Sequence, residues 1–136
     1  MITGINHITF SVIDLDESFE FYKDVMMFKP VQKSPISAYL LAGQTWIALI
    51  HEDSENLKPL REYSHIAFNV TLENFENMKE RIVESGAVEW SENSTEGESF
   101  YFLDPNGHKL EIHCTDLNAR MDYGKKHWGE ETTWFV

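Results

Sequence analysis

Residues 5–12, INHITFSV, and residues 63–70, YSHIAFNV, decide the fold of this chain because they are two copies of one pattern. Each copy has histidine at its third position, and apolar residues occupy every second position after it. Alternation with a period of two predicts a β-strand with one apolar and one polar face. The chain is therefore predicted to contain an internal repeat, with His7 and His65 at equivalent places in its two halves.

A helical pattern follows each predicted strand. Asp14 and Glu17 resemble a capping box, and Thr71 is the second predicted cap. The apolar stripes behind these caps are Leu15, Phe19, Tyr22 and Met26 in the first half, and Leu72, Phe75, Met78 and Ile82 in the second. The second helix should end at Ser85-Gly86. Extended segments then follow, at 38–41 and 46–51 in the first half and at 99–103 and 108–114 in the second, with turns at 42–45 and 104–107.

The order in each half is strand, helix, then two or three strands, which predicts an α+β fold. A half of about 60 residues with one helix covers only one face of its sheet, so the other face must find a partner or line a cleft. We expect a single domain over residues 1–136, with repeat one at about 1–58 and repeat two at about 59–114. The tail, 115–136, is predicted to form a short helix and an aromatic end that packs within the chain or across a dimer.

Composition limits the classes of function. The chain has 136 residues, 42% of them hydrophobic, which is enough for a real core. Its formal net charge of −12 argues against nucleic-acid and anionic-membrane binding, because phosphate recognition needs clustered Lys and Arg. No apolar run approaches the roughly 20 residues that cross a bilayer, so we expect a soluble, cytoplasmic protein. Cys114 is the single cysteine, expected to act as a small buried hydrophobe.

The polar faces of the predicted strands carry the candidate chemistry. Strand parity places His7 with Thr9 and Ser11, His65 with Ala67 and Asn69, and Glu111 with Lys109 and His113. If the three faces converge, His7, His65 and Glu111 form a site for a divalent transition metal with open positions for substrate. The alternative is that each histidine is an ordinary hydrogen-bonded strand residue. His113 is the strongest competing ligand, because it shares a face with Glu111.

The residues carry a family resemblance. The opening TGINHITFSVIDLDESFEFYKDV at 3–25, the YSHIAF strand and above all EGESFYFLDPNGHKLEIH at 96–113 resemble the vicinal-oxygen-chelate superfamily, and specifically fosfomycin-resistance proteins of the glutathione-transferase type. The likeness spans nearly the whole chain. It implies a homodimer of paired βαβββ modules with exchanged modules, in which His7 of one subunit completes a site formed by His65 and Glu111 of the other. It also implies Mn(II) as the metal, and attack of a low-molecular-weight thiol on the epoxide of fosfomycin.

The resemblance also assigns roles by position. Thr9 would hydrogen-bond the oxirane oxygen, Tyr39 would ionise or place the thiol, and Trp46 would wall the pocket. The phosphonate would be held by Thr95, Tyr101 and Arg120. A potassium site would be formed by Asn93, Thr95, Glu96, Gly97 and Ser99. The residues also permit plainer roles, with Tyr39, Trp46 and Tyr101 as core aromatics, Arg120 as a surface cation and 93–99 as a solvated loop.

The sequence departs from the family pattern at several positions. Ser91 and Ser94 stand where the family has lysine and arginine, and the positions of the glutathione pocket are Ser34, Ile36 and Ile50. The segment Lys33–Ala38 lacks the carboxylate that water-adding relatives use, which argues against a hydrolase. Two other hypotheses remain: another enzyme of the superfamily (isomerase, dioxygenase or epoxide hydrolase), or a non-catalytic drug-binding protein. The ligand set also accepts Fe(II), Ni(II) or Zn(II).

Overall fold

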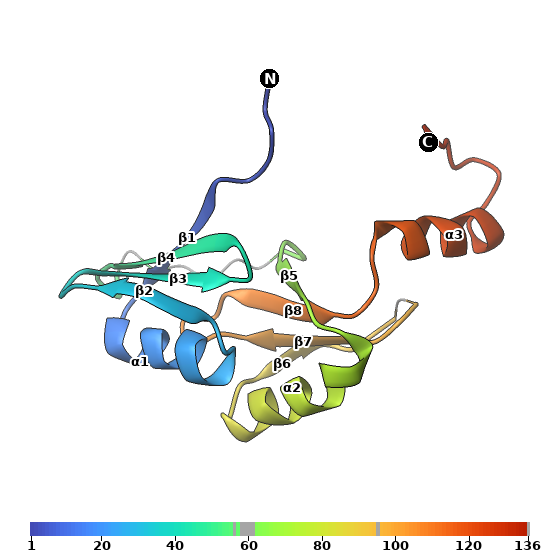
Figure 1. The fold of residues 1–136 in the computed structure, drawn as a ribbon. Helices are drawn as coiled ribbons and strands as arrows, with labels where there is room; N and C mark the ends of the chain where they lie inside the picture. Colours follow the sequence, from blue (N-terminus) through green and yellow to red (C-terminus); the bar gives the residue numbers. More distant parts are fainter. Residues whose placement is uncertain (56, 58–61, 95, 136) are drawn as a thin grey trace.

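The computed structural model describes residues 1–55, 57, 62–94 and 96–135, and it contains two four-stranded sheets. The first module comprises β1 (His7–Val12), α1 (Leu15–Glu20), η1 (Phe21–Val25), β2 (Lys29–Lys33), β3 (Ser37–Ala42) and β4 (Thr45–His51). The second comprises β5 (Ile66–Asn69), α2 (Leu72–Glu84), β6 (Glu89–Ser91), β7 (Ser99–Leu103) and β8 (Lys109–His113), and α3 (Leu117–His127) follows it. The predicted α+β fold of two βαβββ modules is confirmed (Figure 1).

The helix boundaries follow the caps that the sequence predicts. The Asp14 carboxylate accepts a hydrogen bond from the Glu17 amide at 3.0 Å, and the Thr71 hydroxyl accepts one from the Asn74 amide at 3.3 Å. Helix α2 ends at Glu84 with Ser85 as its C-cap, and Gly86 follows with φ of +84°, a backbone conformation that favours glycine. After α1 the chain continues as one π-helical turn, η1, which no feature of the sequence predicted.

Strand order is the same in both modules. In the first the order is β1-β4-β3-β2, and in the second it is β5-β8-β7-β6. Strand β1 runs parallel to β4 and β5 runs parallel to β8, whereas the other pairs are antiparallel. The helix between the first strand of a module and its other three makes this parallel pairing possible.

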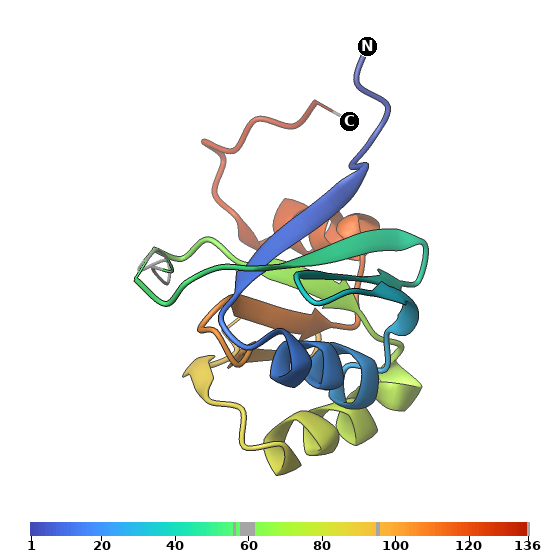
Figure 2. The same ribbon diagram turned by 90° about the vertical axis from the view of Figure 1, so that its left-hand side faces the viewer.

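The core lies on one side of both sheets. Figures 1 and 2 show α1 and α2 packed on that side, and Figure 1 shows α3 beyond the end of β8, so no helix of the described chain covers the opposite faces. Strand β1 turns Phe10 and Val12 into the core, where the Phe10 and Tyr22 rings stack at 5.6 Å. The modules meet through apolar contacts such as the edge contact of Phe28 with Phe68 at 5.2 Å. The two polar faces are therefore left open on the other side of the sheets.

A buried carboxylate fastens the β7–β8 turn to the first module. Asp104 is 5% exposed, and it accepts hydrogen bonds from the Tyr22 hydroxyl at 2.6 Å and from the Nδ1 atom of His108 at 2.7 Å. It also accepts bonds from the backbone amides of Asn106 and His108, each at 2.9 Å. Burial raises the pKa of Tyr22 well above its usual value, and the negative charge of Asp104 raises it further.

The side chain of Asn106 extends the same connection. Its Nδ2 atom donates to the Ser18 hydroxyl at 2.8 Å, and its Oδ1 atom accepts from the Ile13 amide at 2.9 Å. Ser18 and Ile13 belong to the first module, so the turn of the second module is hydrogen-bonded at two points beyond Tyr22.

Among the described residues, no helix is long and apolar enough to span a bilayer.

Candidate metal and substrate site

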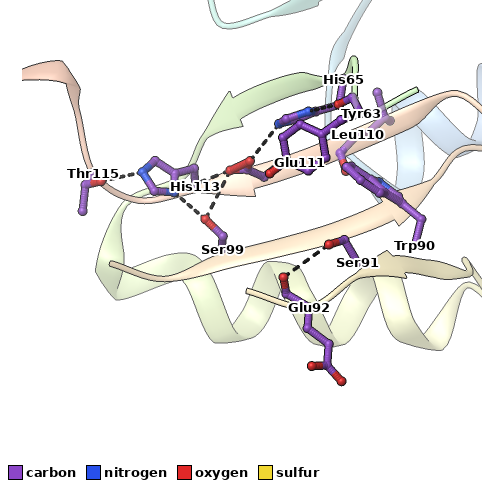
Figure 3. Close-up of polar contacts among 10 residues, drawn as sticks. All are labelled: Tyr63, His65, Trp90, Ser91, Glu92, Ser99, Leu110, Glu111, His113 and Thr115. Carbon is purple, nitrogen blue, oxygen red and sulfur yellow. Dashed lines mark hydrogen bonds and ion pairs between the residues drawn. The ribbon is translucent and has the colours of Figure 1, made fainter. Parts of the chain in front are cut away.

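The centre of the candidate site is a histidine and a carboxylate on the open face of the second sheet. His65 immediately precedes β5, and Glu111 lies in β8 opposite Ala67 of β5. The Nε2 atom of His65 lies 3.1 Å from Oε1 of Glu111, as Figure 3 shows. Glu111 is 6% exposed. The polar faces predicted for these two strands therefore do meet.

Hydrogen bonding determines which ring nitrogen of His65 is available to bind a metal ion. Its Nδ1 atom lies 2.7 Å from the Tyr63 carbonyl oxygen, which only accepts, so Nδ1 carries the proton. Nε2 then faces a carboxylate oxygen that also only accepts. Two lone pairs at this distance repel each other unless a proton or a metal cation lies between them. An imidazole and a carboxylate held in this way are a fitting donor pair for a divalent transition metal.

A layer of hydroxyl groups supports Glu111 from the side away from His65. The Ser99 hydroxyl lies 3.2 Å from Oε2 of Glu111 and 2.5 Å from Nδ1 of His113. The other ring nitrogen of His113 contacts the Thr115 hydroxyl at 2.5 Å. Both nitrogens of His113 are thus engaged by hydroxyl groups (Figure 3), which suits a supporting role around Glu111 more than a ligand role. Sequence parity identified His113 as a competitor but gave no sign of Ser99 in this role.

Aromatic rings line the same open face of the second sheet. Tyr101 is 2% exposed, and its ring centroid lies 5.9 Å from that of His65 and 5.2 Å from that of Trp90. Burial raises the pKa of Tyr101, and the negative charge of Glu111 raises it further, so the phenol stays protonated. Trp90 was not predicted as a site residue. Its indole nitrogen donates to the Leu110 carbonyl at 3.0 Å, which fixes the ring beside the site.

The first sheet gathers the other predicted residues on its own open face. The His7 ring lies 4.4 Å from Trp46, and Trp46 lies 5.0 Å from Tyr39. Thr9 lies opposite Ala48, which in turn lies opposite Tyr39, so all three share a face. His7 and Thr9 are exposed, and the indole nitrogen of Trp46 is buried without a hydrogen-bond partner among the described residues.

The structure of one chain does not bring the three predicted metal ligands together. Within the described residues, no group of three or more His, Cys, Asp or Glu side chains is arranged to hold a metal ion. His7 contacts Trp46 and the Asn6 side chain in the first module, whereas His65 and Glu111 pair in the second. The three-ligand centre therefore stays a prediction, as does the supply of His7 by a second copy of the chain that the family resemblance implies.

A cavity of about 580 Å³ lies where the modules meet. Thr9 and Ser11 line it from the first module, and His65 and Lys109 line it from the second. Glu52 lines it as well, and its Oε1 atom accepts a hydrogen bond from Ser11 at 3.0 Å. The cavity thus combines a candidate metal ligand with hydroxyl groups and a carboxylate.

The predicted potassium and phosphonate residues lie around the loop before β7. Thr95 is outside the described residues. Arg120 of α3 forms an ion pair with Glu96, whose other carboxylate oxygen is buried with no hydrogen-bond partner in the described chain. The Asn93 side chain donates to the Gly97 carbonyl at 3.0 Å, and Gly97 has φ of +76°. Ser99 lies in β7, where its side chain supports Glu111.

The positions that depart from the family pattern carry no positively charged side chain in this chain. Ser91 is half-buried, and its hydroxyl donates to the Glu92 carbonyl at 3.3 Å (Figure 3). Ser94 is exposed. Ser34 closes a local network with Ser37, whose hydroxyl lies 3.0 Å away.

Comparison with known proteins follows from this fold and site. The family model of the Glyoxalase/Bleomycin resistance protein/Dioxygenase superfamily matches residues 4–112, so the chain belongs to this superfamily. Within it, the chain is 38% identical over 123 residues to "Glutathione transferase FosA" of Serratia marcescens, covering 89% of this chain and 87% of that protein. It is also 38% identical over 131 residues to "Metallothiol transferase FosB" of Shouchella clausii (strain KSM-K16), covering 93% and 90% respectively.

Solved structures of fosfomycin resistance proteins have a similar fold. A mutant of the fosfomycin resistance protein FosX from Listeria monocytogenes, complexed with Mn(II) and 1S,2S-dihydroxypropylphosphonic acid, superposes with a TM-score of 0.80. It is 31% identical and covers 90% of this chain and 98% of its own. FosX from Mesorhizobium loti superposes with a TM-score of 0.76 at 30% identity, covering 89% and 99%. The predicted family is therefore confirmed.

Proposed function

We propose that this chain opens the epoxide of fosfomycin, or of a similar small phosphonate epoxide, by adding a low-molecular-weight thiol with the help of a divalent metal. The observation that carries the proposal is the His65–Glu111 pair, in which the Nε2 atom of His65 and a buried carboxylate oxygen of Glu111 lie 3.1 Å apart. The relatives named a glutathione transferase and a metallothiol transferase supply the reaction class.

His7 of a second copy would complete the metal site. His7 is exposed on the open face of the first sheet, and no helix of the described chain covers either open face (Figure 1). Packing the open face of one copy against the open face of another would bring His7 to His65 and Glu111. A symmetric dimer would then hold two such sites, because the same contact occurs twice. Mn(II) is the proposed metal, as in the FosX complex.

The bound metal would stabilise the negative charge that develops on the epoxide oxygen during ring opening. The chain's own residues would orient the reactants. The Thr9 hydroxyl would donate a hydrogen bond to the epoxide oxygen, and the Tyr39 phenol beside Trp46 would place the thiol. Tyr101, protonated because its pKa is raised, would donate to the phosphonate together with Arg120.

A monovalent cation is proposed at the loop before β7. The buried Glu96 oxygen without a partner supports this, since an unsatisfied carboxylate oxygen is costly unless a cation or a donor approaches it. The oxygen atoms that bind the cation would come, as the family resemblance implies, from Asn93, Thr95, Glu96, Gly97 and Ser99. Because Glu96 pairs with Arg120, such a cation would lie near Arg120 and would add positive charge where the anionic phosphonate would bind.

Addition of water is the second candidate function. The molecule bound in the Listeria FosX complex is a dihydroxypropylphosphonic acid, which is the compound that addition of water to this epoxide would give. Glu52 lines the same cavity as Thr9 and His65, so a carboxylate is available as a base even though Lys33–Ala38 contains none. Against this, the two curated relatives described above are thiol transferases by name.

One assay separates the two reactions. Purified protein is incubated with Mn(II) and fosfomycin, together with glutathione, cysteine, bacillithiol or no thiol, and products are identified by mass. A thiol adduct that forms with one thiol and is absent without thiol supports the proposal. A diol formed at the same rate without thiol supports water addition, and no consumption under any condition rejects both. E52Q is the matched variant, because it should slow diol formation while leaving thiol transfer unchanged.

A further inference from the structure

An aromatic cluster packs against the C-terminal part of helix α3. The rings of Trp128 and Trp134, here called the tryptophan pair, stack at a centroid distance of 5.7 Å with an interplanar angle of 8°. Trp128 follows directly after α3, and its amide donates to the Gly124 carbonyl at 2.8 Å. Lys125 lies over the Trp134 ring at 5.5 Å. The tail is therefore folded back onto its own helix by ring contacts.

Gly124 makes this packing possible. It is buried, and a Cβ atom at this position would lie 2.6 Å from Cε3 of Trp128 and 2.8 Å from Cη2 of Trp134. Carbon atoms at such distances overlap, so any larger residue would push both rings off the helix. Glycine costs about 1 kcal/mol relative to alanine in a helix interior. Glycine at this position therefore lowers the helix propensity but allows the tryptophan pair to pack against the helix.

The outer member of this cluster is Arg120. Its guanidinium lies 5.6 Å from the centroid of the Trp128 ring, and it forms the ion pair with Glu96 described above. A guanidinium has five N–H donors in a fixed fork, so one end on Glu96 and one face on an indole leave donors for a second anion. Trp128 limits the rotamers of Arg120 by stacking on it.

We infer that the tryptophan pair is a positioning device that holds Arg120 ready to bind the phosphonate group of the substrate. Arg120 is the residue that touches the substrate, and Trp128, Trp134 and Gly124 act through it. This inference rests on the proposed function, because it assigns Arg120 to the phosphonate. Removal of Trp128 leaves Arg120 charged but free to sample more rotamers, which weakens substrate binding.

This role predicts an effect on binding more than on turnover. The phosphonate does not change during ring opening, so contacts to it are similar in the ground state and the transition state. W128A should raise the dissociation constant and the KM for fosfomycin about three- to tenfold, the range expected for a cation–π contact. W128F should restore part of the loss. G124A should raise KM similarly without lowering the helix content of the protein.

The experiment is a double-mutant cycle of R120A and W128A, read by kcat and KM with the active thiol and by calorimetric titration of fosfomycin into Mn(II)-loaded protein without thiol. F135A is the matched control, because Phe135 is an exposed tail aromatic. R120A should weaken fosfomycin binding by at least about thirtyfold. If Trp128 acts through Arg120, W128A in the R120A background should change binding by less than about twofold.

The outcomes separate the inference from the function on which it rests. Equal losses from W128A in the presence and absence of Arg120 overturn the positioning role, as does a loss confined to kcat. A wild-type protein that turns over fosfomycin while R120A binds it normally also overturns the inference and leaves the reaction standing. A wild-type protein that neither binds nor consumes fosfomycin rejects the proposed function itself.

Discussion

Replacing Tyr22 with phenylalanine tests the connection between the two modules. Tyr22 is fully buried, and its hydroxyl donates to the buried Asp104 carboxylate at 2.6 Å. Y22F removes this donor with almost no change of volume, and Asp104 keeps three others, the backbone amides of Asn106 and His108 and the His108 ring. The loss is therefore that of one hydrogen bond to a charged group.

A hydrogen bond of this kind contributes about 1.5–3 kcal/mol to the free energy of unfolding. For a domain of this size that corresponds to a fall in Tm of about 5–12 °C. Y123F is the matched control, since Tyr123 is 38% exposed and its ring stacks on His127, so its expected change is within about 0.5 kcal/mol.

The pKa of Tyr22 gives a second readout with a definite sign. Its pKa is raised in the folded protein, so the unfolded chain loses the phenolic proton first, from about pH 10 upward. The stabilisation from Tyr22 is fully present below that pH and is lost as pH rises toward the folded-state pKa. Urea unfolding at fixed protein concentration, at pH 7 and above pH 10, should show wild type approaching Y22F at high pH. Equal stability of Y22F and wild type at pH 7 would refute the reasoning.

Two other substitutions test supporting contacts. N106A removes the bonds from the Asn106 side chain to Ser18 and to the Ile13 amide, and it should lower the free energy of unfolding by about 1–3 kcal/mol in urea titrations; an unchanged midpoint would contradict the role of this turn. S99A removes the hydroxyl between Glu111 and His113, and it should weaken Mn(II) binding about tenfold in calorimetric titrations while leaving Tm within a few degrees; unaltered affinity would count against the supporting layer.

Much of the fold could be predicted because it is encoded in local patterns. The alternation after His7 and His65 assigned the faces of β1 and β5, and the caps at Asp14 and Thr71 assigned the helix starts. The π-helical turn η1 could not be predicted, since it follows α1 without any glycine, proline or polar signal. Phe21 and Tyr22 of this turn are buried in the core.

The site could be predicted only in part, for a physical reason. Parity states which residues share a face, and on that basis His65 and Glu111 were correctly expected to meet. Parity does not state which two sheets face each other, and His7 lies with Trp46 on the other sheet. The supporting hydroxyl of Ser99 and the ring of Trp90 depend on the register of β7 with β8 and of β6 with β7, which alternation within one strand does not determine.

The most direct test of the central claim is Mn(II) binding by mixed variants, counted by the loss of the free Mn(II) signal in electron paramagnetic resonance. H7A and E111Q should each bind almost no Mn(II) alone. Co-refolded in equal amounts, they should recover about a quarter of the wild-type sites, because half of the dimers are mixed and each mixed dimer has one intact site. Mn(II) binding by E111Q alone at wild-type affinity would contradict the metal site, and a mixture that recovers no sites would contradict the contribution of His7 from a second copy.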